Sequence, residues 1–585
     1  MNEQKGVKRK KKSFLHKTMK FYKKGIHGRG VRIDEETFEY FVHILKVINQ
    51  NFETEDDKRA FVENVFEQLE GNEIEYSRNQ VVSRIVDNLL PFASDERVRQ
   101  FMEVFGENVR PVCTDPFASF VFQKLMSVVT RRFLDEESAS TTATATASTA
   151  AEETRSKYKP WLVKTFSYVL NNVEEFVFDQ YANHVMRTAI KCMAGDTQLR
   201  ENESNFVVDD QDFRAILDNF ASRLLKWPQL SKLPLQNLSS GLVQVLLESL
   251  SKSNSKLVKR LCRKFLGECY SRQENDGGDD DDDGAKAVVP AYFENEPCIR
   301  LLEAMLSVAS AKTYAKINVK CFAKRIALLA QHKEANFAVQ KLIKYCAEKE
   351  QFEAIFDELE GCFEEILDRG YSGVILNLCE ACVRLKTKQS VFVRLWMDCL
   401  HCNEPKEAQS CVFKLTVFLK KRQQFDEEKH VNVHLHGSLL VQNLLKFNKP
   451  IKIINSLLEA RSSCLVNIFG SPKGSRIADS FFQSQFVGEK SKDKFAKMFQ
   501  GCYTSLATSK HGSRVFDTVW AASNVKNRIA IASELSENES KLYESPFGRP
   551  IIYKTSLAQF RHNRDDWVQA QNQGDKVKKL FAEIT

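Results

Sequence analysis

The chain has 585 residues, of which 43% are hydrophobic and 28% charged, and its formal net charge is +8 at pH 7. This length exceeds that of a single-core domain, so we expect several domains or one extended array. No apolar run reaches the length of a membrane span, and no apolar stretch follows the N-terminal charges as in a secretory signal. From the lack of such a run we expect no membrane partner. The 15 scattered cysteines favour reduced core thiols in an intracellular protein.

The first thirty residues account for the net positive charge of the chain. They hold eleven Lys or Arg and one Glu, which leaves the rest of the chain near −2. Because this segment lacks apolar periodicity, we expect residues 1–30 to form a basic disordered tail. The tail can act in nuclear import or in nucleic-acid binding, and the alternative is a solvated tail without a targeting signal. The cluster that favours import is Lys8, Arg9, Lys10, Lys11 and Lys12.

Helical patterning begins near residue 34, where Phe38, Phe41 and Val42 fall at helical spacing. We find no sustained alternating runs of the kind that strands require, so the fold is predicted to be all-α. The helical array is expected to cover residues 31–565, followed by a C-terminal tail at 566–585.

Two segments interrupt the helical pattern. Residues 135–155 are rich in Ser, Thr and Ala, and residues 271–288 contain a run with seven acidic side chains. Neither segment has apolar periodicity, so both are predicted to be disordered insertions within the array.

A short phrase returns along the chain at intervals that are mostly 36 to 38 residues. A fixed period in this range indicates a repeat architecture, in which each unit must stack on its neighbours to bury its apolar face. We therefore predict an α-solenoid or superhelix, curved or U-shaped, of about eleven units. Their reference positions, called i below, are Ser83, Ser119, Asn183, Ser240, Ile299, Asn336, Gly373, Ser438, Ser475, Ser513 and Arg549.

The better units place polar side chains at i and i+4 and an aromatic ring or Arg at i+1. On a helix, i and i+4 share a face and i+1 lies to one side. Two polar groups one turn apart can bond the edge of a base, and a ring or guanidinium can stack on its face. Helix capping by Ser or Asn is the alternative for any single unit. The candidate RNA-binding residues are Ser83, Arg84, Asp87, Ser119, Phe120, Gln123, Asn183, His184, Arg187, Asn336, Phe337, Gln340, Ser438, Gln442, Ser475, Arg476, Asp479, Ser513, Arg514 and Asp517.

The segments 117–125, 335–342 and 511–517 resemble the RNA-reading helix of Pumilio repeats. This resemblance implies three-helix units, each reading one base of single-stranded RNA from its second helix. It also implies a uracil-type reader at Asn336, Phe337 and Gln340. The three Ser-Arg-x-x-Asp sets resemble guanine-type readers in which Asp replaces the usual Glu. The sets that begin at Gly373 and Arg549 depart from the pattern.

The unit number, the insertions and the Lys-rich N-terminus are similar to those of the nucleolar Pumilio-like branch, the nucleolar protein nine family. Segments 38–41, 113–119 and 545–549 carry this resemblance. It implies a monomer in the nucleus and nucleolus that binds the small-subunit ribosomal RNA precursor together with pre-ribosomal proteins. It also implies that the protein assists or guards RNA processing without catalysis and without a cofactor.

Other chemistry finds less support in the sequence. Cys379, Cys382, Cys399 and Cys402 have the spacing of a zinc site, but both pairs lie in apolar helical segments without the turn such sites use. No phosphate-binding Gly-Lys-Ser/Thr loop and no Gly-x-Ser-x-Gly elbow occurs, so we expect no enzyme. The alternative function is a protein-binding solenoid of the HEAT or armadillo type in nuclear transport or assembly.

Overall fold

The computed structural model describes residues 27–48, 54–142, 148–197, 210–270, 289–427 and 432–584, with single positions at 14, 18, 19, 52 and 199. Side chains are described outside 138–157 and 575–584. These residues are largely helical, and the one β-bridge among them pairs Gly30 with Asn79. The all-α prediction is thus confirmed. Within the same residues, no helix is long and apolar enough to cross a bilayer.

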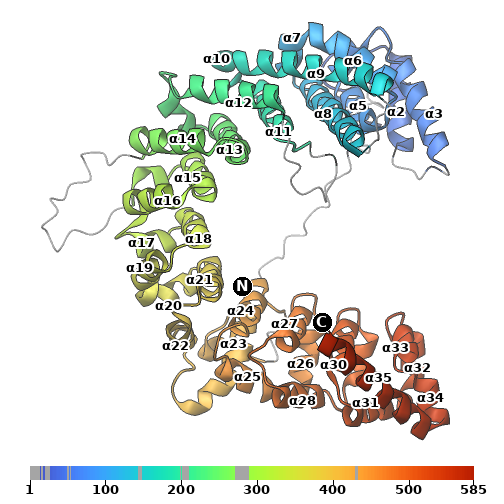
Figure 1. The fold of residues 1–585 in the computed structure, drawn as a ribbon, viewed down its shortest axis with the longest axis vertical. Helices are drawn as coiled ribbons and strands as arrows, with labels where there is room; N and C mark the ends of the chain where they lie inside the picture. The colour runs from blue at the N-terminus through green and yellow to red at the C-terminus, as the bar shows by residue number, and fades with distance from the viewer. Residues whose placement is uncertain are drawn as a thin grey trace, which may run out of the picture. The chain divides into compact units, whose positions relative to one another are not determined.

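Each of the eleven reference positions lies on a helix, and we call these the reference helices (Figure 1). One compact unit of the chain ends at Thr313 and a second begins at Tyr314. The reference helices of the first unit are α5 (Gln80–Leu89), α8 (Ala118–Thr142), α11 (Ala182–Met193), α13 (Asn237–Ser251) and α15 (Glu296–Val308). Those of the second are α18 (Ala335–Tyr345), α21 (Ser372–Leu385), α24 (Leu435–Leu444), α27 (Ser475–Gln483), α30 (Gly512–Ala522) and α33 (Gly548–Lys554).

Most reference helices follow a short helix and precede a longer one, which gives the three-helix repeat. The flanking helices of the first unit are α2 (Glu35–Val47), α3 (Glu55–Glu67), α4 (Glu73–Ser77), α6 (Asp95–Glu107), α7 (Val109–Cys113), α9 (Ser148–Asn171), α10 (Val173–Phe176), α12 (Gln211–Leu224) and α14 (Ser255–Glu268). After α16 (Ala311–Ile317), those of the second are α17 (Ile326–Ala330), α19 (Lys349–Leu359), α20 (Phe363–Asp368), α22 (Gln389–Cys399), α23 (Val412–Phe418), α25 (Ile451–Leu458), α26 (Ser462–Phe469), α28 (Glu489–Lys497), α29 (Tyr503–Thr508), α31 (Val525–Glu537), α32 (Glu539–Glu544), α34 (Leu557–His562) and α35 (Arg564–Ile584).

Most neighbouring reference helices within each unit pack directly on each other. Helix α8 lies between α5 and α11, and α27 lies between α24 and α30. The sequence of α5 shows why, because Val81, Val82, Ile85 and Val86 are all fully buried. Apolar pairs one turn apart give the helix two buried flanks, and only the narrow edge between them carries polar side chains.

Both ends of the predicted array lie further out than expected. The Asn79 amide donates to the carbonyl oxygens of His27 and Val31, at 3.1 and 3.0 Å, so the fold begins before residue 31. At the other end, α35 crosses the predicted tail at 566–585. Its Trp567 is fully buried and donates from Nε1 to the Thr555 carbonyl at 2.8 Å. At each end, a single buried residue, Asn79 or Trp567, fixes the segment to the fold. One such residue in a charged segment gives no periodic pattern in the sequence. The cluster at residues 8–12 lies outside the described residues.

The predicted insertion at 135–155 is also partly wrong. Residues 135–142 continue α8 and residues 148–155 open α9, which leaves only 143–147 outside the described part of this segment. Alanine is the strongest helix former, and it alternates with Ser and Thr here, so helices can extend without an apolar face. The second predicted insertion, 271–288, lies outside the described residues.

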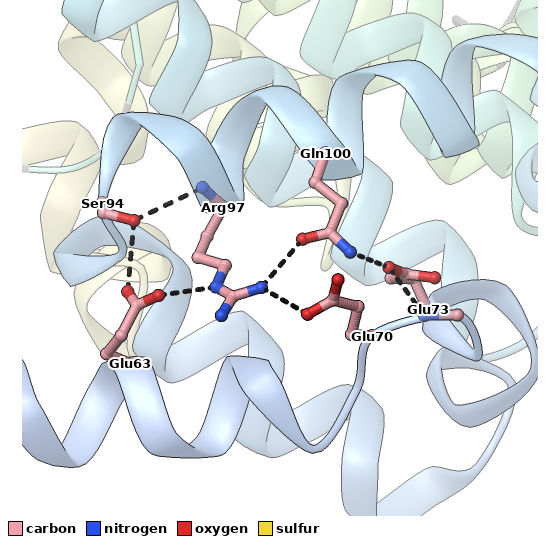
Figure 2. Close-up of polar contacts among 7 residues, drawn as sticks. Glu63, Glu70, Glu73, Ser94, Arg97 and Gln100 are labelled. Carbon is pink, nitrogen blue, oxygen red and sulfur yellow. Dashed lines mark hydrogen bonds and ion pairs between the residues drawn. The ribbon is translucent and has the colours of Figure 1, made fainter.

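A polar network joins α3 to α6 near the start of the fold (Figure 2). Arg97 donates from Nε to Glu63 at 2.6 Å and from Nη1 to Glu70 at 2.9 Å. Gln100 accepts from Arg97 and donates to Glu73. Hydrogen bonds to Glu70 and Glu63 raise the pKa of Arg97 above its usual value. The network therefore holds the outer face of the first repeat in a defined arrangement.

Replacing Arg97 by Met should destabilise the α3–α6 pair by about 1–2 kcal/mol, because the carboxylates of Glu63 and Glu70 lose their shared donor. Hydrogen–deuterium exchange of α3 peptides measures this change. The matched control is Arg59→Met, because Arg59 is 77% exposed and its contact to Asp56 is long at 3.8 Å. Equal exchange in the two variants would contradict a stabilising role for the network.

Candidate nucleic-acid interface

The side chains at i+1 point away from the packed flanks of the reference helices. Phe120 and Phe337 are 55% and 49% exposed. The side chains of Arg476 and Arg514 are 55% and 53% exposed. Most large apolar side chains of a folded protein are buried, so two exposed phenylalanines at the same repeat position are informative. Arg476 and Arg514 lie on α27 and α30, which pack directly on each other.

Arg84, His184, Arg300 and Pro550 are also exposed at i+1. The Arg84 guanidinium lies 4.4 Å from the centre of the Phe14 ring, so this position already stacks on a flat apolar surface. Partial burial lowers the pKa of His184, and the nearby Arg187 lowers it further. A lowered pKa favours the neutral imidazole, a flat ring without charge.

The serines at position i are more buried than a base-contacting role suggests. Ser83, Ser119, Ser438 and Ser475 are at most 5% exposed. The Ser438 hydroxyl donates to the Lys473 carbonyl of the following repeat at 2.6 Å, and Ser83 and Ser475 donate to carbonyls three residues back. Ser513 is half-buried and donates to Lys510. Position i therefore takes part in packing, and its contact with a base stays a prediction.

Asn183 departs furthest from its predicted role. It is fully buried, and its amide donates to the Val177 carbonyl at 2.7 Å, so it holds the loop before α11. Its partner Arg187 donates to the carbonyl oxygens of Asn237 and Leu238 on α13. Arg187 therefore joins α11 to α13, whereas Asn183 acts within its own repeat. Asn183 Oδ1 and Arg187 Nε are buried and have no hydrogen-bond partner among the described residues. Only His184 of this set keeps an exposed face.

The glutamines at i+4 are held from within their own repeat. Gln340 donates to Asn336 Oδ1 at 2.9 Å, and Gln442 donates to Ser438 Oγ at 3.0 Å. Gln123 donates to the Ser119 carbonyl at 3.2 Å. Residues i and i+4 thus lie one turn apart on one face of the helix, and their contact with a base stays a prediction. Each amide keeps further donor and acceptor capacity for a ligand.

A second set of contacts joins i+4 of one repeat to i+5 of the next. Asp479 accepts from Thr518 at 3.0 Å, and Gln123 accepts from Thr188 at 3.0 Å. The i+5 residues were missed in the sequence, although a polar residue there in successive units was a usable signal. The five i+5 residues with such contacts are Lys124, Thr188, Ser480, Thr518 and Lys554.

Two reference positions that depart from the Ser or Asn pattern have other roles. A Cβ on Gly373 would lie 2.5 Å from Gln340 Oε1, so glycine leaves room for the neighbouring amide. Arg549 donates to the Tyr543 carbonyl at 2.7 Å, and Tyr553 at i+4 is 78% exposed. The last repeat therefore presents an aromatic ring, although it lacks the expected polar pair.

The four cysteines with zinc-like spacing lie in the core. All four are buried, and burial raises the pKa of Cys382, Cys399 and Cys402 to about 12 and that of Cys379 well above its usual value. No group of His, Cys, Asp and Glu side chains suited to a metal ion occurs in the described part of the chain. Thiols in this setting stay protonated and behave as apolar core atoms.

At pH 7.5, iodoacetamide should modify Cys411 and Cys502, which are partly exposed, well before Cys379, Cys382, Cys399 and Cys402. The reason is that the reaction needs an accessible thiolate, which burial disfavours. Mass spectrometry of timed digests gives the order, with unfolded protein as the control in which all sites react together. Fast reaction of the four buried thiols after treatment with a chelator would instead indicate a metal site.

Flat side chains on the exposed edges of stacked three-helix units define this protein as an α-solenoid of Pumilio type. A family model described as the NOP9-like PUF repeat domain matches residues 71–209 and 196–550. The chain therefore belongs to the NOP9-like PUF repeat family, as the sequence resemblance predicted.

Known relatives agree over most of the chain. It is 24% identical to nucleolar protein 9 of Mus musculus and to that of Homo sapiens, in each case over 94% of this chain and 91% of the relative. Pumilio homolog 23 of Arabidopsis thaliana is 21% identical over 92% of this chain and 73% of its own length. The solved structure of APUM23 with GGAGUUGACGG matches with a TM-score of 0.71 at 19% identity, covering 92% of this chain and 99% of that chain. At this identity, the structural match supports the fold.

Proposed function

We propose that this protein binds RNA along the exposed edges of its reference helices. Its proposed target is the ribosomal RNA precursor of the small subunit, whose processing it assists or guards in the nucleolus without catalysing a reaction. We further propose that it acts as a monomer among pre-ribosomal proteins. The observation that carries RNA binding is the exposed stacking side chain at i+1 on successive reference helices. The names of its relatives and the RNA in the APUM23 structure support the target class.

The chemistry of the exposed edge suits single-stranded RNA. A base can stack on Phe120 or Phe337, or on the guanidinium of Arg476 or Arg514, because each base has a flat π-face. Polar groups at i+4 lie one turn away and can bond the base edge. A duplex keeps its bases stacked on one another, so it cannot offer the same faces to the protein.

Positive side chains lie close to these edges. Lys473 and Lys510 are exposed and precede position i of their repeats by two and three residues. A lysine there can bind the phosphate that follows a bound base, which makes binding weaker as salt concentration rises.

Replacing Phe337 by Ala should weaken binding of single-stranded RNA by about 1–3 kcal/mol, because one base loses its stacking surface. Fluorescence anisotropy of the full chain with labelled small-subunit precursor fragments measures the change. The matched control is Phe92→Ala, because Phe92 is also 49% exposed but lies outside the reference helices. Equal affinity of the two variants would contradict stacking at i+1.

A triple variant, in which Arg84, Phe120 and Phe337 are all replaced by Ala, extends the test. Loss of single-strand binding with an unchanged melting temperature supports RNA as the ligand. If the wild-type chain binds no RNA, or if the triple variant binds as well as the wild type, the exposed edge serves a protein partner. The protein-binding solenoid then becomes the better hypothesis.

Replacing Lys8, Arg9, Lys10, Lys11 and Lys12 together by Gln should abolish nuclear accumulation and lower RNA affinity only mildly. This design keeps His27, whose carbonyl bonds to Asn79 in the fold. Microscopy of a fluorescent fusion gives the localisation, and the same substitution of Lys252, Lys256, Lys259, Arg260 and Lys264 controls for charge. Full nuclear entry of the tail variant would refute import by this cluster.

A further inference from the structure

The contacts between neighbouring repeats at i+4 and i+5 keep the same register in both compact units. In the first unit, Lys124 lies 3.7 Å from Asp87, and Thr188 lies 3.0 Å from Gln123. In the second, Ser480 donates to Gln442 at 3.5 Å, and Lys554 forms an ion pair with Asp517 at 2.7 Å. Each contact runs from an i+5 donor to an i+4 acceptor of the repeat before it. A shared register across different residue types indicates a common geometric role.

Asp479 shows the arrangement most fully. Thr518 at i+5 of the next repeat donates to Oδ1 at 3.0 Å, and Arg514 at i+1 of that repeat donates to Oδ2 at 3.2 Å. Arg476 lies further away, at 3.9 Å from Oδ2. The Asp479 side chain is 20% exposed, so it is held firmly while one edge still faces the surface. Both of its oxygens are thereby oriented from the following repeat.

These contacts reduce the conformational entropy that the carboxylate or amide at i+4 loses when it binds a base. A loose side chain loses rotamer freedom on binding, and a side chain already held loses less. The hydrogen bond from i+5 also occupies one lone pair on the oxygen of the i+4 side chain. Only the remaining lone pairs can accept from the edge of a base. Orientation of this kind changes which base fits best more than it changes total affinity.

We infer that the side chain at i+5 of one repeat is a specificity-determining positioning residue for the base bound by the preceding repeat. This inference rests on the proposed RNA binding and deepens it. Arg187 and Gln340 have no polar i+5 partner, and they are held instead by backbone carbonyls and by Asn336. Specificity is therefore shared between adjacent repeats wherever the i+5 contact exists.

The test compares Thr518→Val with the wild-type full chain. Valine keeps the shape of threonine and removes the hydroxyl, so Asp479 loses one of its donors. Each protein selects binders from a library of randomised single-stranded RNA, and sequencing gives the base preference at every position. We expect Thr518→Val to relax the preference about fivefold at a single position, with total affinity changed less. Thr518→Ser should restore that preference.

Two further variants identify which repeat reads the affected position. Asp479→Asn alters the base bound by the repeat that contains Asp479, and Asp517→Asn alters the base bound by the next repeat. The inference requires that Thr518→Val changes the position that Asp479→Asn changes. Thr508→Val is the matched control, because the Thr508 hydroxyl donates within α29 to the Thr504 carbonyl.

The outcomes separate the two hypotheses. A change at the position sensitive to Asp517→Asn, or no change in any preference, would overturn the positioning role while RNA binding stands. Selection of no RNA by the wild-type chain would overturn the proposed function and this inference with it. Melting curves of all variants check that altered preference does not come from unfolding.

Discussion

The burial of each reference helix on two flanks is the constraint on which the rest of the structure depends. A helix packed between two neighbours has little freedom to present side chains, because most of its circumference is core. On α5, four apolar residues from Val81 to Val86 are fully buried, and Arg84 is left exposed between them. The exposed edge is therefore narrow. On α5, α8, α11, α15, α18, α27 and α30 its i+1 side chain is an exposed ring or Arg.

The polar residues of that edge follow from the same constraint. A side chain at i lies close to the preceding loop or to the following repeat, and its polar group bonds to backbone carbonyls there, as Asn183 does with Val177 and Ser438 with Lys473. A side chain at i+4 lies at the boundary between two repeats, where the neighbouring i+5 residue can reach it. Two-sided packing thus divides the edge into a stacking position, a packing position and a position shared between repeats.

The ends of the array need a different solution, because a terminal repeat has a neighbour on one side only. At the start, α2 packs on α5, and Asn79 ties residues 27–31 to the first repeat. At the end, α35 covers the last helices with Trp567, which also contacts Phe560. Both devices close an exposed apolar surface. In the first repeat, the hydrogen bonds of Arg97 to Glu63 and Glu70 join α6 to α3. They act beside the aromatic contact between Phe66 and Phe101.

Much of the fold was predictable from the sequence, because periodicity within one helix depends only on residues a few positions apart. The all-α class, the reference positions and the pairing of Asn336 with Gln340 came from such local spacing. The structure corrected the array ends, the helical parts of 135–155 and the role of Asn183. These depend on what packs against a segment, which local spacing does not contain.

The sequence by itself determined that the chain repeats, that its repeats are helical, and which side chains share a helix face. Only the tertiary structure decided which of those side chains face a neighbour and which face solvent. Ser119 and Phe120 are adjacent in sequence, yet one is 1% exposed and the other 55% exposed. The reason is that helix geometry sets directions around one axis, whereas contact between Asp479 and Thr518 requires two axes to lie side by side at a defined register.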